Sequence, residues 1–490
     1  MNYTNKRKAP YYNFWKVYFG EDEAKGDNKL PQYFLRIPEF DDIKSGKYRY
    51  IIGRKGTGKT AIIEQLIHEI EPKYNCFYRS MSLKNFPIQI VRNLKDKTLG
   101  GKAQFVPIWS FLILMELCKL IIEDQSNEPH EAVFELSLFI KTNFPNSLGF
   151  TETLRTLESS ENKVSILEKW LNISSTNKVE NETMVSVHYQ KAFEIILRLL
   201  KNLKVKSTYY IFFDELDEGY TSGDPKLNLL LLALIRSTEN CFIELKNYFS
   251  FIPILALRSD IFNNLTDNDL NKLDDYIIHL KWTTESKSPY SLYQLVNYRI
   301  AASLPIKKNE IFNAWELATF NQDKYLPPNI KSLWDYMYNR TFERPRDIVK
   351  FLKCCSKLNQ KGKLNFKAVQ LAENEYSDWF YREFRDEVQS HLPVWQESTQ
   401  AIMKLGRGVF QMEELKKEFE KDITLMNYMK NQNVNHEYIM EKLFDFGLIG
   451  TLSESNKWFF RYKDYNLPFL TNQKIILHFG FARKFRIRPW

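Results

Sequence analysis

Three short, mostly apolar runs set the first pattern along the chain. They cover residues 48–52, 209–213 and 252–257. A strand that is buried on both faces of a parallel sheet has continuous rather than alternating apolar positions, so these runs predict core strands. Segments 76–81 and 276–282 predict two further strands.

Apolar residues spaced three and four apart predict helices between and after these strands. The predicted helical ranges are 61–70, 109–122, 132–140, 164–171, 189–200, 227–235, 292–302, 330–338 and 348–358. Strands that alternate with helices predict an α/β fold, a three-layer sandwich around a parallel sheet. The stretch 100–205 is mostly helical, and we interpret it as an insertion between core strands.

The turn after the first predicted strand has the sequence GRKGTGKT and fits every fixed position of G-x-x-x-x-G-K-[ST]. In such a loop, backbone N–H groups converge on a phosphate, and the following helix N-terminus adds partial positive charge. Lys59 is predicted to bridge the β- and γ-phosphates, and the Thr60 hydroxyl to bind Mg²⁺. The residues predicted to contact the nucleotide are Gly53, Arg54, Lys55, Gly56, Thr57, Gly58, Lys59, Thr60 and Ala61.

The apolar run 209–213 ends in Asp214 and Glu215. Ligands of open α/β sheets bind at the carboxyl ends of the strands, which is where these acids fall. We expect Asp214 to hold the Mg²⁺ shell and Glu215 to orient and polarise the attacking water. For Asp217 and Glu218, a helix N-cap is favoured over support of the site.

A third polar strand tip follows residues 252–257 and begins with Arg258. A polar side chain there can reach the γ-phosphate, so Arg258 is the candidate, with Ser259 as the second choice. The alternative is an Arg258 that only pairs with Asp260, an interaction of little energetic value at a surface.

The sequence ERPRD precedes the predicted helix 348–358 and places Arg346 near its N-terminus, where proline is favourable. Arg346 is predicted to face the phosphates of a nucleotide. The alternative is that the two arginines of ERPRD only form surface salt bridges with Glu343 and Asp347.

Composition shifts divide the chain into four parts. We predict an aromatic leader at 1–46, an ATPase core at 47–285, a helical lid at 286–390 and a winged-helix-like domain at 391–490. The leader's rings suit a nucleotide base, although packing onto the core is the favoured explanation for any single ring.

The last domain is predicted to contain three helices and a hairpin. The helices are 395–405, 412–420 and 436–446, and the hairpin joins 449–452 to 458–462. The tail carries Arg483, Lys484, Arg486 and Arg488 without a neighbouring acid in the sequence. However, the third helix is more acidic than basic, which opposes contact with DNA phosphates, so a protein-docking role is favoured.

The overall composition adds little to the prediction of what kind of protein this is. The chain has 490 residues, a net charge of +9 and five cysteines without a C-x-x-C pair, so reduced thiols are expected. The most apolar run, 105–122, is broken by Pro107, Glu116 and Lys119, which predicts a core helix and no membrane partner. A cytoplasmic location is the default expectation.

Taken in order, the segments GRKGTGKT, FFDELDE, LALRSD and ERPRD and the terminal domain resemble the AAA+-like branch of P-loop ATPases. That branch includes origin-recognition-type and STAND ATPases. The aromatic LPQYF before the loop is similar to a family of bacterial P-loop ATPases found among phage-defence and mobile-element genes. The resemblance covers nearly the whole chain and is weakest in 100–205. It implies Walker A residues Lys59 and Thr60, Walker B residues Asp214 and Glu215, sensor 1 at Arg258 or Ser259, and sensor 2 at Arg346.

The resemblance implies ATP and Mg²⁺ as ligands. A guanine nucleotide is not expected, because the sequence has no N-K-x-D-like motif that would bind guanine. The sensor 1 position departs from the usual Asn or Thr, and no clear arginine finger is present; Arg236 is a guess from its place after the acidic strand. The implied function is an ATP-hydrolysing switch or assembly platform in antiphage defence, acting as a homo-oligomer or with an effector protein. Alternatives are a nucleotide-gated scaffold with little turnover and a DNA-binding loader.

Overall fold

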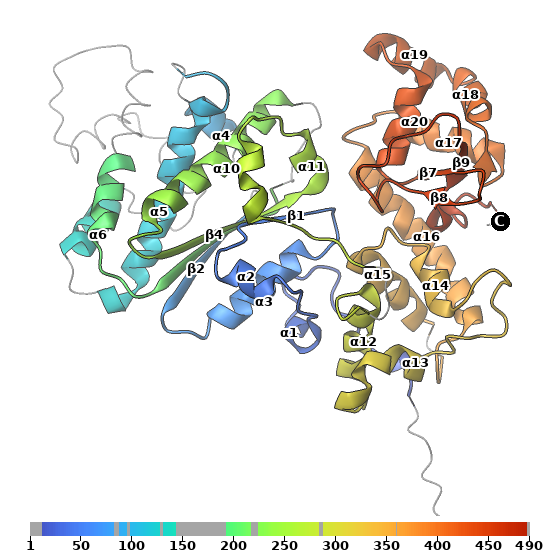
Figure 1. The fold of residues 1–490 in the computed structure, drawn as a ribbon, viewed down its shortest axis with the longest axis horizontal. Helices are drawn as coiled ribbons and strands as arrows, with labels where there is room; N and C mark the ends of the chain where they lie inside the picture. The colour runs from blue at the N-terminus through green and yellow to red at the C-terminus, as the bar shows by residue number, and fades with distance from the viewer. Residues whose placement is uncertain are drawn as a thin grey trace, which may run out of the picture. The chain divides into compact units, whose positions relative to one another are not determined.

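The computed structural model describes residues 12–82, 88–95, 99–127, 131–143, 193–216, 224–283, 288–358 and 360–487. It divides into two compact units (Figure 1). The sheet unit comprises Pro38–Arg54 and Lys59–Leu280, and the C-terminal unit comprises Met1–Ile37, Lys55–Gly58 and Lys281–Trp490. The predicted helix 164–171, the start of 189–200, Asp217, Glu218 and Arg488 lie outside the described residues.

The sheet unit is built on five parallel strands. They are β1 (Tyr50–Gly53), β2 (Cys76–Ser82), β3 (Thr208–Asp214), β4 (Ser250–Arg258) and β5 (Ile277–His279). Their order is β2-β3-β4-β1-β5, so β4 lies between the loop-bearing strand and the acidic strand. The five predicted strands are confirmed, and the burial of β3 from Tyr209 onward explains its unbroken apolar run.

Helices cover both faces of this sheet, as the α/β prediction requires (Figure 1). Figure 1 shows α4, α5 and α10 over one face and α2 and α3 over the other. The helical segments are α2 (Phe40–Lys44), α3 (Lys59–Ile70), α4 (Ile88–Asn93), η2 (Gly101–Phe105), α5 (Val106–Glu123), η3 (Gln125–Asn127), α6 (Glu131–Asn143), residues 193–201, α10 (Pro225–Leu245), α11 (Ser259–Asn264) and η4 (Leu270–Tyr276).

Helix α5 is the most apolar element of the sheet unit. Among the described residues, Gly101–Glu123 is the one helical stretch long and apolar enough to cross a membrane, but 78% of its apolar window is buried inside the protein. The helix packs against α10 and the sheet within one apolar cluster. It therefore occupies the position of the core helix that its interrupting Pro107, Glu116 and Lys119 predict.

The C-terminal unit joins the leader to the helices after β5. Its first helical segments are η1 (Phe14–Lys16), α1 (Leu30–Tyr33), α12 (Leu292–Ser303), η5 (Lys308–Asn313), α13 (Ala314–Ala318), α14 (Leu333–Tyr338), α15 (Pro345–Ser356) and α16 (Phe366–Val388). Phe14 and Phe19 of the leader are buried with Leu292 and Val296 of α12 in the same core. This burial accords with the packing interpretation of the leader's aromatic rings.

The rest of this unit is four helices and a four-stranded sheet. They are α17 (Trp395–Leu405), β6 (Val409–Phe410), α18 (Met412–Glu420), α19 (Ile423–Gln432), α20 (His436–Asp445), β7 (Ile449–Leu452), β8 (Trp458–Phe459), β9 (Lys474–Leu477) and the short η6 (Phe479–Phe481). The strand order is β6-β9-β7-β8, with antiparallel pairing. The three predicted helices and the hairpin are present, whereas α19, β6 and β9 were not predicted. The lid and the last domain share one core rather than separate ones.

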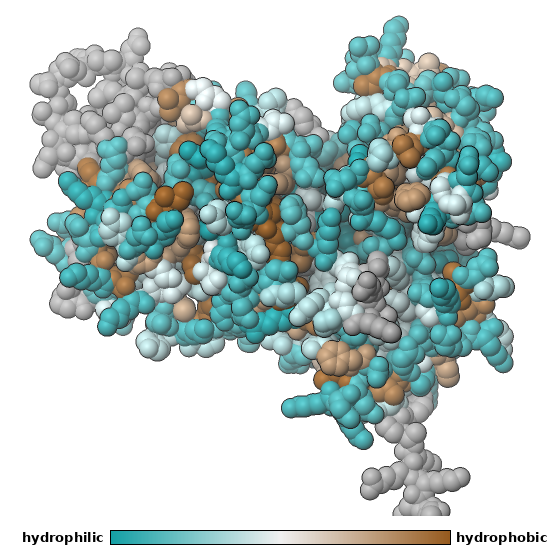
Figure 2. Space-filling model, viewed as in Figure 1, coloured by the Kyte–Doolittle hydropathy of each residue, from teal (hydrophilic) through white to brown (hydrophobic). Residues whose placement is uncertain are grey.

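The described surface has no single large apolar face in view. Figure 2 shows a mainly hydrophilic face with scattered brown side chains. Among the described residues, the four most exposed large apolar side chains, Tyr74, Phe134, Tyr325 and Ile423, come from different segments, and Leu138 lies one turn after Phe134 on α6. Singly exposed apolar side chains of this kind are ordinary for globular proteins.

Candidate phosphate-binding site

The loop between β1 and α3 has the backbone that a phosphate site requires. Gly56 and Gly58 have φ values of +82° and +102°, in the left-handed region that glycine tolerates best. The Lys59 ammonium donates to the carbonyl oxygens of Gly53 (2.8 Å) and Arg54 (3.1 Å). Because the ammonium has three donors that rotate freely, phosphate oxygens can take the place of these acceptors.

Asp214 lies at the end of β3, and its carboxylate meets the Thr60 hydroxyl that follows Lys59. Its Oδ1 also accepts the N–H of Glu215 at 2.8 Å. Burial raises the pKa of the Asp214 carboxyl, while the bonds from Glu215 N–H and Thr60 and the charge of Lys59 oppose this rise. The two residues predicted to bind the metal are thus brought together within the sheet unit.

The donors of this pair fit Mg²⁺, because carboxylate and hydroxyl oxygens are the hard ligands that this ion prefers. Within the described ranges, no cluster of three or more His, Cys, Asp or Glu side chains offers an all-protein metal cage. A two-residue site that leaves positions for water and phosphate oxygens is typical of Mg²⁺ at a nucleotide.

Glu215 has an unusual backbone, with φ of +54° in a residue that is not glycine. Such a conformation costs about 1–3 kcal/mol and persists only where the surrounding structure enforces it. Its Oε2 accepts a hydrogen bond of 2.5 Å from the hydroxyl of Ser82. Ser82 ends β2 directly opposite Asp214 in the parallel register. Sequence reasoning missed Ser82; knowledge of the strand order would have pointed to it.

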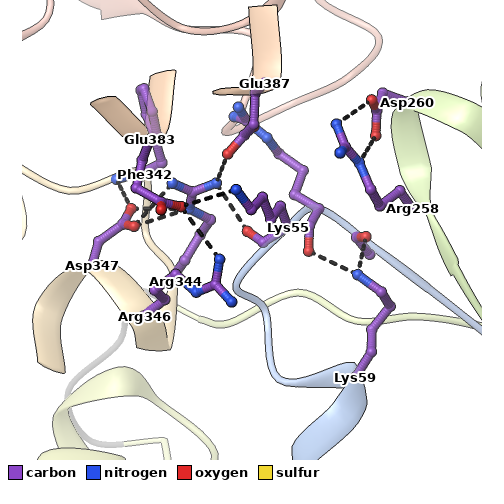
Figure 3. Close-up of polar contacts among 12 residues, drawn as sticks. Lys55, Lys59, Arg258, Asp260, Phe342, Arg344, Arg346, Asp347, Glu383 and Glu387 are labelled. Atoms are coloured by element: carbon purple, nitrogen blue, oxygen red, sulfur yellow. Dashed lines mark hydrogen bonds and ion pairs between the residues drawn. The ribbon is translucent and has the colours of Figure 1, made fainter. Parts of the chain in front are cut away.

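Arg258 ends β4 opposite Gly53, so it lies at the same edge of the sheet as the start of the loop. Its guanidinium makes two bonds to the Asp260 carboxylate, of 3.0 and 2.6 Å (Figure 3). The ion pair that was weighed as an alternative is therefore present, and Ser259 is buried at the start of α11. Contact of Arg258 or Ser259 with a γ-phosphate stays a prediction.

Arg346 lies in the first turn of α15, within the C-terminal unit that also contains the loop apex Lys55–Gly58. Its N–H donates to the Gly56 carbonyl at 3.3 Å. A Cβ on Gly56 would lie 2.8 Å from Cβ of Arg346, so only glycine allows this approach. The Arg346 side chain is 31% exposed and pairs with Glu383 at 3.3 Å. Its predicted contact with phosphate is not tested by this geometry.

The other arginine of ERPRD, Arg344, is almost fully buried. It makes a two-pronged pair with Asp347, bonds Glu387 of α16 and donates to the Lys55 carbonyl at 2.9 Å. Burial acts to lower the pKa of Arg344, but the carboxylates of Asp347 and Glu387 raise it. The Arg344–Asp347 salt bridge is thus buried, not the surface pair that the sequence suggested. We did not single out Arg344 from the sequence, although its motif drew attention.

A cavity of about 320 Å³ lies elsewhere in the sheet unit, between α10 and the η4 segment. Phe242, Leu273 and Tyr276 are among its lining residues. Arg236, the guess for an arginine finger, also lines this cavity. The loop and the acidic pair contribute no residue to it.

The basic tail is less free of acids than the sequence suggested. Arg483 lies 3.3 Å from the buried carboxylate of Glu373, and Lys484 lies 2.7 Å from Asp378. Both acids belong to α16, about a hundred residues earlier in the chain. Two of the tail's cations therefore have intramolecular partners.

Comparison with known proteins gives one family match. A model described as the FunZ-associated C-terminal helical domain matches residues 290–385, which span α12 to most of α16. The comparison with curated proteins found no match.

Comparison with solved structures gives matches that include the following two. Cdc6p from Pyrobaculum aerophilum is 10% identical, with 92% of this chain and 94% of that chain covered and a TM-score of 0.31. The Drosophila ORC bound to DNA is 12% identical, with 94% and 92% covered and a TM-score of 0.26. Both TM-scores are low, so the assignment of an α/β fold rests on the sheet order and loop geometry described above.

Proposed function

We propose that this chain is a magnesium-dependent ATPase of the AAA+/STAND-like class, acting as a nucleotide-driven switch or assembly platform in the cytoplasm. One observation carries the proposal: the Thr60 hydroxyl of a complete phosphate loop meets the buried Asp214 carboxylate beside Lys59. A buried carboxylate needs a compensating charge, which a Mg²⁺ ion bound by Thr60 and Asp214 would supply.

In this proposal each residue has a separate task. Lys59 and the loop N–H groups would neutralise the phosphate charge, and Thr60 and Asp214 would hold Mg²⁺. The bound ion would screen the charge that develops on the phosphates during transfer. Glu215, fixed by its bond to Ser82, accepts a proton from the attacking water.

The C-terminal unit supplies the switch. Arg346 packs its backbone on Gly56, and its half-exposed guanidinium is held by Glu383. We propose that this guanidinium exchanges Glu383 for the γ-phosphate when ATP binds and returns after hydrolysis. Binding of ATP would in this way change the ion pair between Arg346 of α15 and Glu383 of α16.

The resemblance to phage-defence ATPases extends the proposal to antiphage defence, with a homo-oligomer or an effector protein as partner. A DNA-binding loader with a winged helix is the second candidate. The pairing of Arg483 and Lys484 with acids of α16 lowers the charge available to DNA phosphates, so we favour a protein partner.

The first test is steady-state ATP turnover of the purified protein, with and without double-stranded DNA, and with Glu215→Gln as the blank. Turnover that Glu215→Gln abolishes, while ATP binding persists, would support the ATPase. Stimulation by DNA would support a DNA-binding role for the C-terminal domain. Turnover equal to the blank in both conditions would overturn autonomous hydrolysis and leave the nucleotide-gated scaffold.

A further inference from the structure

Three consecutive carbonyl groups at the apex of the phosphate loop accept hydrogen bonds from the rest of the C-terminal unit. The Lys55 carbonyl accepts from Arg344 Nη1 at 2.9 Å. The Gly56 carbonyl accepts from the N–H of Arg346 at 3.3 Å, and the Thr57 carbonyl accepts from Trp282 Nε1 at 2.9 Å.

The planar trans peptide links each of these carbonyls to an amide. In such a peptide unit the C=O of one residue and the N–H of the next point in opposite directions. Bonds that fix the carbonyls of Lys55, Gly56 and Thr57 therefore also fix the N–H groups of residues 56–58 on the opposite side. Those N–H groups are the donors with which a loop of this type binds phosphate.

We propose that Arg344, Trp282 and the N–H of Arg346 form a carbonyl clamp that pre-orients the loop amides for phosphate. The proposal rests on the proposed nucleotide site and adds positioning residues to it. A loop that is already ordered loses little conformational entropy when the ligand binds. Its affinity for the ligand is therefore higher than that of a flexible loop.

The clamp is itself rigid, because Arg344 is held from several sides. Its Nε and Nη2 donate to Asp347, and Nη1 donates to Glu387 and to the Lys55 carbonyl. Asp347 is fixed in turn by the N–H of Phe342 at 2.9 Å. Both Arg344 and Asp347 are at most 1% exposed.

The same bonds make Arg344 unsuitable as a phosphate ligand. An arginine has five N–H donors, and four of those of Arg344 are engaged with Asp347, Glu387 and the Lys55 carbonyl. A guanidinium committed in this way acts through the loop backbone. It is a positioning residue, not a catalytic one.

Trp282→Phe is the cleanest variant to test the clamp. It removes the indole N–H that bonds Thr57 and keeps an aromatic ring at a half-buried position. Replacement of Arg344 would leave Asp347 and Glu387 buried without their cation and can prevent folding. Trp458→Phe is the matched control, since Trp458 is also half-buried but packs against Phe460 and Phe479.

Two readouts are measured on each purified full-length protein. The first is Mg-ATP affinity by calorimetry, which we expect Trp282→Phe to weaken about fivefold, the value of one hydrogen bond. The second is the rate of tryptic cleavage after Lys55 in nucleotide-free protein, which we expect to rise several-fold because the loop apex is released. Trp458→Phe should match the wild type in both.

The outcomes separate the clamp from the nucleotide site. Wild-type protein that binds no ATP would overturn the proposed function, while the cleavage rates would still decide on the clamp. Unchanged cleavage in Trp282→Phe would overturn the clamp whether or not ATP binds. Faster cleavage with unchanged affinity would overturn the pre-orientation of the amides.

Discussion

The flanks and the apex of the phosphate loop have different partners. On the flanks, Lys59 bonds the carbonyls of Gly53 and Arg54, and Thr60 meets Asp214, all within the sheet unit. At the apex, the carbonyls of residues 55–57 accept bonds from the C-terminal unit. In our proposal, the flanks carry the charge that binds phosphate, and the contacts at the apex determine where the amides point.

The partners of the flanks and of the apex also differ in where they lie along the chain. Residues on the flanks belong to the motif and interact with their sequence neighbours or with the end of β3, two strands away in the sheet. The donors at the apex come from Trp282, Arg344 and Arg346, far along the chain. The clamp, as we propose it, would make the conformation of an intact phosphate-loop motif depend on residues that lie more than two hundred positions away in the chain.

The largest expected effect contrasts the two lysines of the loop. Lys59→Met should weaken Mg-ATP binding about a hundredfold or more, because it removes a charge-assisted contact to the phosphates. Lys55→Met should lose about threefold or less, because Lys55 contributes its backbone while its ammonium lies 3.6 Å from Glu383. Calorimetry on both variants measures the contrast. Losses of equal size would mean that flank and apex do not differ in this way.

An intermediate effect is expected on the flank side at Ser82. Ser82→Ala removes the hydroxyl that fixes the Glu215 carboxylate and should reduce ATP turnover about three- to tenfold. Mg-ATP affinity should stay within about twofold of wild type, since Glu215 acts on the water. Ser80→Ala is the control, on the same strand but exposed. A rise in turnover would show instead that Ser82 restrains the carboxylate.

The smallest effect is expected on the apex side at Glu383. This carboxylate pairs with both Lys55 and Arg346, so Glu383→Gln frees two cations next to the loop. Mg-ATP affinity should rise about two- to threefold at low salt and return toward wild type at high salt. Glu375→Gln, on the same helix but paired with Lys357, should have no such effect. A loss of affinity would mean that Glu383 holds the apex in its binding form.

Short sequence motifs and apolar runs predicted the residues of the site that lie within or next to them. The loop GRKGTGKT, the acidic pair Asp214 and Glu215 and the five strands could be predicted because a motif or an unbroken apolar run encodes each one. The strand order then brings Arg258 and Ser82 to the same edge, but residue patterns do not state that order.

The partners at the apex could not be predicted for a physical reason. Arg344 lies 289 positions from Lys55, and Trp282 lies 225 positions from Thr57. No periodicity connects residues at such separations, and an arginine followed by proline resembles any charged helix start. The predicted helical lid 286–390 includes α16, but no bounds were predicted for this helix, because its apolar positions are interleaved with many charges.

Helix α16 connects two distant contacts within the C-terminal unit. It has 23 residues, which makes it about 34 Å long. Near its middle, Ser377 bonds the Gly480 carbonyl of the final segment, and near its end Glu387 bonds Arg344 of the clamp. A partner that displaces the final segment would therefore tilt α16 and change the loop's affinity for ATP. Because coupling between two ligands is reciprocal, ATP would change that partner's affinity by the same factor.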